Sequence, residues 1–482
     1  MSKTPSVAYS VTIRAEYANQ PGMLGQVSSA IGAAGGDITA VDIASSDGRR
    51  IVRTLTLNAS DQAHVRRITR AVRKVAGVRV LGVTDEVFRV HSGGKIEVRS
   101  KVDVRNRNDL SLVYTPGVGR VSMAVHDDPD SVWSSTIRGN SVAVVSDGTA
   151  VLGLGDIGPE AAMPVMEGKA MLFKQFAGID AWPICLATKD PDRIVETVLN
   201  LAPTFGGVNL EDISAPRCFD IEERLREELP IPVMHDDQHG TAVVVLAGLL
   251  NALRVVGKRI EDIRAVVLGA GAGGSACARI MLAAGARNVV VLDRQGILTR
   301  RREYPDNPMK RWLAEQTNPD NLEGGLDEAI TGADFFLGLS GPGLLSRNQV
   351  ARMAADAVVF ALSNPDPEVH PDEVGGLVRV MATGRSDFPN QVNNALCFPG
   401  VFRGALDVRA SGINEEMKLA AAHAIAAIVS EKERCEEYVI PSIFNPAVAP
   451  AVARAASDAA IRTGVARAPG GRGGRGRAAP RR

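Results

Sequence analysis

The chain has 482 residues, 45% of them hydrophobic, and a formal net charge of zero. This length exceeds what one hydrophobic core usually supports, so we expect two or three domains, and the balanced charge gives no reason to expect nucleic acid or an acidic membrane as a partner. The five cysteines are scattered without metal or disulfide spacing, and we see neither a signal core nor an apolar run that could span a bilayer, which indicates a cytoplasmic protein.

Residues 1–90 follow the order strand, helix, strand, strand, helix, strand. The stretch VAYSVTIRAE alternates as a strand does, and Asp61 is a good N-cap for the amphipathic helix that follows it. This order predicts a ferredoxin-like α+β sandwich. With the NQPGML turn at residues 19–24, the segment resembles the ACT domains, small modules that bind amino acids or other effectors and often pair across subunits. The resemblance leaves effector binding and simple dimerisation as equal alternatives.

The polar stretch at residues 91–104 is expected to be a linker, and it precedes a second domain at residues 105–238. Tyr114 opens a Thr-Pro-Gly turn, where a tyrosine is usually structural and becomes a candidate acid only if a site faces it. Further on, Lys169 lies among apolar residues of a predicted helix. A buried lysine can act as a base near neutral pH, although a single helical lysine more commonly extends its amine to solvent.

Two acidic pairs follow two strand-like segments between Val208 and Ala242. Glu211 and Asp212 end the first segment, and Asp236 and Asp237 end the second. Two strand ends in one sheet can bring such carboxylates together, and oxygen ligands of this kind suit Mg²⁺ or Mn²⁺. A lone acidic pair is more often a solvated loop, but a Gly-rich nucleotide-type loop follows shortly afterwards, which favours the metal site.

A dinucleotide-binding motif is the second strong signal, in a third domain at residues 239–462. A predicted strand runs into a Gly-x-Gly-x-x-Gly loop and a helix, and the next strand ends at Asp293. The loop glycines are Gly269, Gly271 and Gly274. They allow a sharp turn and close approach of a pyrophosphate at the helix N-terminus, while Asp293 suits the ribose 2′-hydroxyl of NAD. Arg294 beside it leaves NADP open.

The later segments continue a doubly wound α/β pattern. Loops with Asn364 and with the pair Asn393 and Asn394 follow predicted strands, at the edge where such sheets bind ligands, although asparagine there is usually a turn residue. The tail at residues 463–482 is basic and low in complexity, so we expect it to be disordered and solvated.

The stretch from about residue 105 to 460 resembles the malic enzymes, specifically the bacterial form with a fused regulatory module. The resemblance rests on motifs in one order: YTPGV, SDGTAVLGLGDIG, PVMEGKAMLFK, VNLEDISAPRCF, HDDQHGTA, GAGAGG, ALSNP and VNNALCFPG. It implies a substrate domain packed against a variant Rossmann domain, with the active site in the cleft between them. The implied reaction is oxidative decarboxylation of (S)-malate to pyruvate and CO₂ with NAD, or NADP, and Mg²⁺ or Mn²⁺.

The resemblance also implies roles for individual residues. Glu211, Asp212 and Asp237 would hold the metal. Lys169 would remove the hydroxyl proton with Asp236 as its charge partner, and Tyr114 would protonate the product carbon. Asn364 and Asn394 would orient the substrate, with Asn364 also near the cofactor. One departure concerns Ala150, which stands where longer eukaryotic members carry a substrate-binding arginine. The resemblance therefore does not identify which cationic residue of this chain would bind that substrate carboxylate.

Two other functions remain as alternatives. An amino-acid dehydrogenase also combines a catalytic lysine with a Rossmann domain, but it needs no metal and leaves the acidic cluster unexplained. A non-catalytic sensor with a degenerate enzyme body would lack catalytic side chains, and every expected one is present. We expect a homodimer or a higher homo-oligomer, with malate as substrate and an amino acid or another small molecule as a candidate effector.

Overall fold

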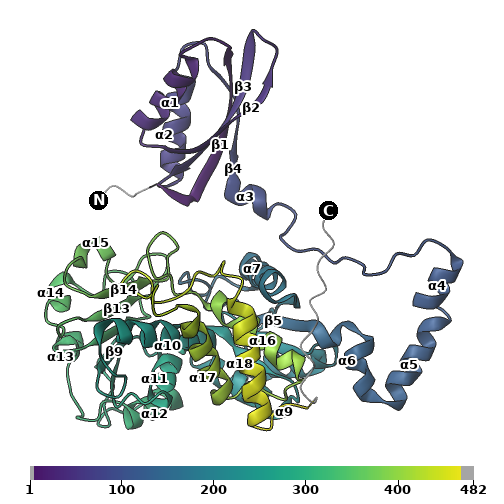
Figure 1. The fold of residues 1–482 in the computed structure, drawn as a ribbon, viewed down its shortest axis with the longest axis vertical. Coiled ribbons are helices and arrows are strands. Elements are labelled where there is room, and N and C mark those ends of the chain that lie inside the picture. Colours follow the sequence, from purple (N-terminus) through teal and green to yellow (C-terminus); the bar gives the residue numbers. More distant parts are fainter. Residues whose placement is uncertain (1–4, 468–482) are drawn as a thin grey trace. The chain divides into compact units, whose positions relative to one another are not determined.

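The computed structural model describes residues 5–467 (Figure 1). The described chain divides into two compact units, with the division between Arg99 and Ser100. The tail that we predicted to be disordered falls outside the described residues from position 468 onward.

The first unit is an antiparallel sheet covered by two helices. Its strands are β1 (Ser6–Ala18), β2 (Asp37–Ser46), β3 (Arg50–Ala59) and β4 (Arg79–Asp85), in the order β2-β3-β1-β4. Its helices are α1 (Met23–Ala33), α2 (Gln62–Arg73) and the short α3 (Glu86–His91). Ile13, Leu55 and Ile68 are fully buried in the core between the sheet and the helices α1 and α2. The predicted ferredoxin-like fold is confirmed, and Asp61 caps α2 by accepting a hydrogen bond from the backbone N–H of His64.

The second unit contains two parallel sheets, the first of four strands. They are β5 (Ser141–Ser146), β6 (Asp180–Cys185), β7 (Gly207–Leu210) and β8 (Val233–His235), in the order β6-β5-β7-β8. Alternate residues of β5 face opposite sides, as the period of two in a strand requires. Val142 and Val144 pack on α7 (Pro159–Ala177), whereas Ala143 and Val145 pack towards α8 (Pro191–Leu201) and α9 (Arg217–Glu228).

The second sheet has six strands in the order β11-β10-β9-β12-β13-β14, parallel except for the β10–β11 pair. They are β9 (Arg264–Leu268), β10 (Asn288–Asp293), β11 (Gly296–Ile297), β12 (Phe335–Gly338), β13 (Val358–Ala361) and β14 (Val380–Thr383). Helices α10 (Asp236–Val256), α11 (Ala272–Ala283), α12 (Pro308–Gln316), α16 (Phe398–Asp407), α17 (Glu415–Ile428) and α18 (Val448–Arg462) contribute to the core on one face. The shorter α13 (Leu326–Ile330), α14 (Arg347–Val350) and α15 (Pro371–Val374) contribute to the core on the other. The doubly wound α/β fold is confirmed.

One hydrophobic core joins the two sheets. It includes Val144 of β5, Val267 of β9 and Phe360 of β13, together with residues of α10 from Ala242 onward. Contrary to the expectation from hydropathy, α10 is long and apolar enough to cross a bilayer, but 72% of its apolar window is buried inside the protein. It is therefore the central core helix of this unit, and its apolar composition reflects packing on all sides.

A helical arm precedes the first parallel sheet. It consists of α4 (Arg107–Val113), α5 (Gly117–Asp127), the 3₁₀ turn η1 (Pro129–Ser131), α6 (Val132–Ser135) and the turn η2 (Ile137–Asn140). A side chain at Gly117 would meet the backbone carbonyls of Ser111 and Leu112, so glycine is required for the close turn between α4 and α5. None of the residues in α4, α5 or α6, all within the described chain, is buried.

Candidate active site

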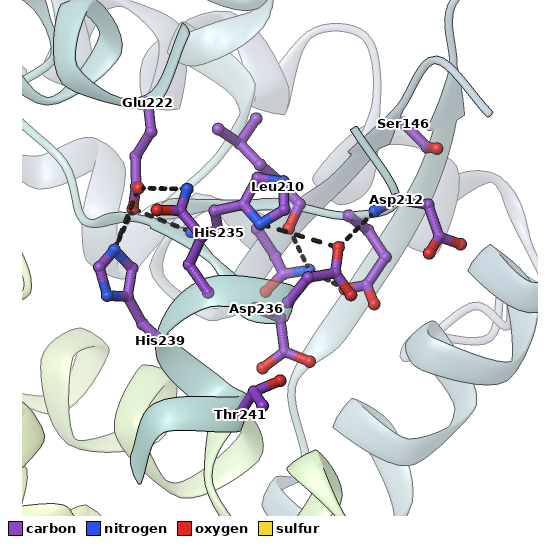
Figure 2. A network of polar contacts seen from close by, with 12 residues as sticks. Ser146, Leu210, Asp212, Glu222, His235, Asp236, His239 and Thr241 are labelled. Carbon is purple, nitrogen blue, oxygen red and sulfur yellow. Dashed lines mark hydrogen bonds and ion pairs between the residues drawn. The ribbon is translucent and has the colours of Figure 1, made fainter. Parts of the chain in front are cut away.

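Three carboxylates converge where β7 and β8 end. Glu211 and Asp212 follow β7 directly, and Asp237 lies in the first turn of α10, which begins directly after β8. Because β7 and β8 are neighbouring parallel strands, their carboxyl ends lie at the same edge of the sheet. One oxygen from each carboxylate lies within 4.8 Å of the others. Asp237 also accepts a hydrogen bond of 2.7 Å from the backbone N–H of Asp212, visible in Figure 2.

The charges in this cluster favour a bound cation. Burial, together with the neighbouring Asp237 carboxylate, raises the pKa of Asp212 to about 8. Burial also raises the pKa of Glu211 well above its ordinary value, against the opposing effect of Lys169. One oxygen of Asp212 is buried without a hydrogen-bond partner. Buried, mutually repelling carboxylate oxygens with a free lone pair are a suitable donor set for Mg²⁺ or Mn²⁺.

Lys169 on α7 faces the same cluster. Its Nζ atom lies 2.6 Å from Asp236 and 2.9 Å from Glu211, and its side chain is only 11% exposed. Burial lowers the pKa of this amine, but the carboxylates of Asp236 and Glu211 outweigh that effect and hold the pKa above its ordinary value. The lysine is thus an internal ion-pair partner and does not extend to solvent.

Asn394, in the turn η4 (Asn394–Leu396), extends this network. Its amide donates a 3.0 Å hydrogen bond to the Asp236 oxygen that also contacts Lys169. Thr241 lies beside it, with its hydroxyl oxygen 3.2 Å from the same amide nitrogen. The side chains of Lys169, Asp236 and Asn394, from three distant segments, therefore form one continuous polar chain.

Asn364 reaches the edge of this region through its backbone. It follows β13, and its carbonyl oxygen would lie 2.5 Å from a Cβ atom at Gly153, in the Gly-rich loop after β5. That loop is tied to the acidic cluster because the N–H of Ala150 donates to the carbonyl of Asp212 over 2.9 Å. The loop after β5 thus connects the acidic cluster to the asparagine loop of the second sheet.

The dinucleotide motif has the geometry that its glycines predict. A side chain at Gly269 would collide with the carbonyl of Leu339, and one at Gly274 would collide with the carbonyl of Gly269. A Cβ atom at Gly271 would meet only open space, where a pyrophosphate could approach the N-terminus of α11. Gly273 packs against the carbonyl of Asp237, so the cofactor loop and the acidic cluster adjoin.

Asp293 ends β10, where a ribose would lie, and it is ion-paired. Lys310 on α12 lies 2.8 Å from its carboxylate and Arg302 lies 3.0 Å from it. Although burial opposes this effect, the hydrogen bonds from Arg302 and Lys310 hold the pKa of Asp293 below its ordinary value. The carboxylate is thus charged and also shielded by two cations.

Of the three predicted catalytic residues, Tyr114 is the one that the described chain does not bring to the cluster. It lies at the turn between α4 and α5 with 66% of its surface exposed. The extensive contacts of α4 and α5 are with each other, with η1 and with α6, and none is with the strands that carry the site.

Behind the cluster lies a buried polar network that the sequence pattern did not predict. The carboxylate of Glu222 on α9 accepts hydrogen bonds from the backbone N–H of His235, from Gln238 and from His239, as Figure 2 shows in part. His239 also contacts Lys418 of α17, at 3.1 Å. Glu222 lies in a densely charged helix, and this composition suggested that the helix face is exposed to solvent. Only the spacing of Glu222 from the apolar residues Ile221 and Leu225 could have indicated that its side chain is buried.

A second missed residue is Arg217, at the start of α9. Its guanidinium lies 3.0 Å from the carboxylate of Asp147 and 3.0 Å from the hydroxyl of Thr149. These residues belong to the segment in which Ala150 replaces the expected arginine, so a cation does contact that segment, although it comes from another element.

Comparison with protein families covers most of the chain. Residues 93–226 match the N-terminal domain of malic enzymes and residues 238–461 match their NAD-binding domain. Residues 5–81 match the ACT domain.

Individual relatives show the same pattern. The chain is 57% identical to an NAD-dependent malic enzyme of Geobacillus stearothermophilus, over 97% of this chain and 98% of that protein. It is 55% identical to a bifunctional malic/malolactic enzyme of Bacillus subtilis, over 80% and 95% of the two chains. A crystal structure of malic enzyme from Pyrococcus horikoshii, 51% identical, superposes with a TM-score of 0.75 over 78% of this chain and 89% of that one.

Proposed function

This chain belongs to the malic enzyme family and is an NAD-dependent, decarboxylating malic enzyme, and from that membership we propose a metal-assisted mechanism for it. The substrate is (S)-malate and the products are pyruvate, CO₂ and NADH. The observation that carries the mechanism is the cluster of three carboxylates against Lys169, directly beside the cofactor loop.

Glu211, Asp212 and Asp237 are the residues that would hold Mg²⁺ or Mn²⁺. When bound, the ion would supply positive charge beside the 2-hydroxyl and C1 carboxylate of malate. That charge would also lower the pKa of Lys169, which the acidic cluster raises. The support for this assignment is the buried donor set, with its raised carboxyl pKa values and an unpartnered oxygen on Asp212.

After its ammonium group has released a proton to solvent, the neutral amine of Lys169 accepts the proton of the 2-hydroxyl while hydride passes from C2 to the C4 atom of the nicotinamide. Asp236 and Asn394 orient the amine, because Asp236 contacts both of them through the same oxygen. The C4 carboxylate then leaves as CO₂, and its bonding electrons remain on the carbon skeleton. Tyr114 supplies a proton to C3, which completes pyruvate.

Gly271 would leave room for the pyrophosphate of the cofactor, and Asp293 would contact its ribose. Asn364 lies where the asparagine loop meets the Gly-rich loop after β5, at the edge of the sheet where such folds bind ligands, and this supports our assignment of Asn364 to both substrate and nicotinamide. Arg302 and Lys310, which pair with Asp293, place two cations beside the proposed ribose position. They could favour a 2′-phosphate, so we keep NADP as a secondary cofactor.

The ACT domain makes the enzyme responsive to a small effector such as an amino acid. We also assign the protein to the cytoplasm and to a homodimer or higher homo-oligomer. The domain limits that we propose remain residues 1–90, 105–238 and 239–462, with a linker at residues 91–104.

The test follows reduced nicotinamide by absorbance with malate, NAD or NADP, and Mn²⁺ either added or withheld. Metal-dependent reduction with pyruvate as product is the expected result. Reduction that proceeds without metal, or only with an amino acid, would move the chain to the amino-acid dehydrogenase class. Absence of any reduction while an amino acid still binds would indicate a sensor.

A further inference from the structure

Two loops of the second sheet lie beside the dinucleotide loop. In the strand order β11-β10-β9-β12-β13-β14, β10 lies on one side of β9 and β12 on the other, so the carboxyl ends of β9 and β12 form the switch point at which such sheets bind ligands. The dinucleotide loop follows β9. The loop of residues 339–343 follows β12, and the loop that carries Asn364 follows β13. The relative position of these loops therefore matters for any reaction at this edge.

The carboxylate of Glu368 holds the two loops after β12 and β13 together. Its Oε1 atom accepts a 2.9 Å hydrogen bond from the backbone N–H of Ser340, in the loop after β12. Its Oε2 atom accepts a 3.1 Å hydrogen bond from the backbone N–H of Ser363, in the loop after β13. Glu368 is fully buried, so water does not compete for these two hydrogen bonds. One side chain thus fixes the backbone of both loops.

The chain around Glu368 reinforces this link. The carbonyl of Pro367 accepts a hydrogen bond from the N–H of Gly343 over 3.1 Å, and the carbonyl of Glu368 accepts one from the N–H of Leu345 over 3.0 Å. Gly338 ends β12, and a Cβ atom there would lie 2.3 Å from the Cδ atom of Glu368. A side chain at position 338 would therefore displace the carboxylate, which explains the glycine at the end of this strand.

Each of the two loops adjoins one component of the proposed reaction. Leu339 precedes Ser340, and its carbonyl oxygen would lie 2.5 Å from a Cβ atom at Gly269 of the dinucleotide loop. Asn364 follows Ser363 and is the residue assigned above to substrate and nicotinamide. The Glu368 carboxylate therefore connects the loop that packs on the cofactor motif with the loop that carries a substrate residue.

We propose that Glu368 is a positioning residue for hydride transfer, which acts through the backbone of Ser340 and Ser363 and fixes Asn364 relative to the dinucleotide loop. The inference rests on the proposed function, because it concerns the alignment of malate and NAD in that reaction. Hydride transfer requires C2 of malate and C4 of the nicotinamide in close, aligned contact, and a misplacement of about 1 Å can lower the rate by ~10²-fold. Loss of this link should therefore impair the chemical step more than binding.

Glu368→Gln tests the role, because the amide keeps the length of the side chain but has one acceptor oxygen for two N–H groups. We expect kcat to fall by ~10–100-fold, while the binding of NAD and of Mn²⁺ remains close to that of the wild type. With malate deuterated at C2, the isotope effect on kcat should be at least as large as in the wild type, because hydride transfer limits turnover. Glu373→Gln, at an exposed glutamate of α15, is the matched control and should leave both quantities unchanged.

A double-mutant cycle tests whether the carboxylate itself is the cause. Gly338→Ala should lower kcat to a similar degree, because its methyl group displaces the carboxylate. In a Glu368→Ala background the same substitution should have no further effect, since the two changes act on one link. If Glu368→Gln does not fold, the kcat of Gly338→Ala decides alone.

Three results would overturn the positioning role: wild-type kcat in either single variant, loss of the isotope effect, or effects of the two substitutions that multiply independently. Absence of metal-dependent malate oxidation in the wild-type protein is a different result, and it would contradict the proposed function itself.

Discussion

The Nζ atom of Lys169 lies 2.6 Å from Oδ2 of Asp236, and the Asp236 side chain is fully buried. Lys169→Ala should lower turnover by ~10²–10⁴-fold because it removes the group that takes the hydroxyl proton, while NAD binding stays close to normal. Stopped-flow turnover and NAD titration by fluorescence separate the two effects. Lys174→Ala on the same helix is the control, because that lysine is exposed and pairs with Asp180. Near-normal turnover in the Lys169 variant would remove it from the mechanism.

Metal binding can be measured without activity, through thermal or chemical unfolding. Saturating Mn²⁺ should stabilise the wild-type protein by ~2.7 kcal/mol at a hundredfold excess over its Kd. Asp212→Asn should abolish this gain yet leave the metal-free protein at least as stable, because it removes a repelling carboxylate. The exposed Asp220→Asn should retain the full gain. An unchanged response to Mn²⁺ in the Asp212 variant would exclude this carboxylate as a ligand.

Cofactor preference should depend on Asp293. Its removal leaves Arg302 and Lys310 without their shared carboxylate beside the ribose, so Asp293→Ala should favour the 2′-phosphate of NADP. We expect the ratio of kcat/KM for NAD to that for NADP to fall at least about tenfold, or ~1.4 kcal/mol. Asp306→Ala, at an exposed position before α12, is the control. A ratio that does not change would place the ribose elsewhere.

Stability at acid pH should depend on Glu222. Burial opposes its ionisation, but His239, His235 and Lys418 together outweigh burial and lower the pKa of this carboxyl to about 2, from 4.5. Its contribution is therefore complete above pH 4.5 and is lost as the pH falls towards 2, since the unfolded chain binds a proton first. Glu222→Gln should cost about 1–3 kcal/mol at pH 7, and the difference from wild type should shrink below pH 4.5.

Urea unfolding at pH 7 and near pH 3.5 measures this difference, and the exposed Glu223→Gln is the control on the same helix. A cost that stays constant across the two pH values would mean that the Glu222 charge does not stabilise the fold. A cost close to zero at pH 7 would contradict the structural role of the network.

The sequence was sufficient where local pattern and topology agree. Glu211 and Asp237 could be assigned to one site because two strand ends of one sheet, each followed by carboxylates, were expected to converge. The structure adds that these strands, β7 and β8, are parallel neighbours. The glycines of the dinucleotide loop could also be assigned from the sequence, since each has a distinct steric role. The ferredoxin-like order of the first ninety residues followed from period and turn chemistry alone.

Other features depend on packing between segments that lie far apart in the sequence. Glu222 lies among charged neighbours, and its burial becomes visible only when α9 packs beside β8. The apolar composition of α10 is ambiguous between a membrane and a core until its neighbours are known. Tyr114 lies on the arm of α4 and α5, whose extensive contacts do not include the site strands, so a motif could name the residue but not its surroundings.

Helix α10 has a consequence for engineered chimaeras of this protein. It begins with Asp236 and Asp237 at the end of the first sheet and continues through the shared core to Gly257, where a left-handed glycine ends it. A recombination point at residues 238–239, the domain limit proposed above, would join the acidic residues of one parent to a helix fitted to the packing of another. A crossover just after Gly257 would transfer the helix together with its acidic first turn.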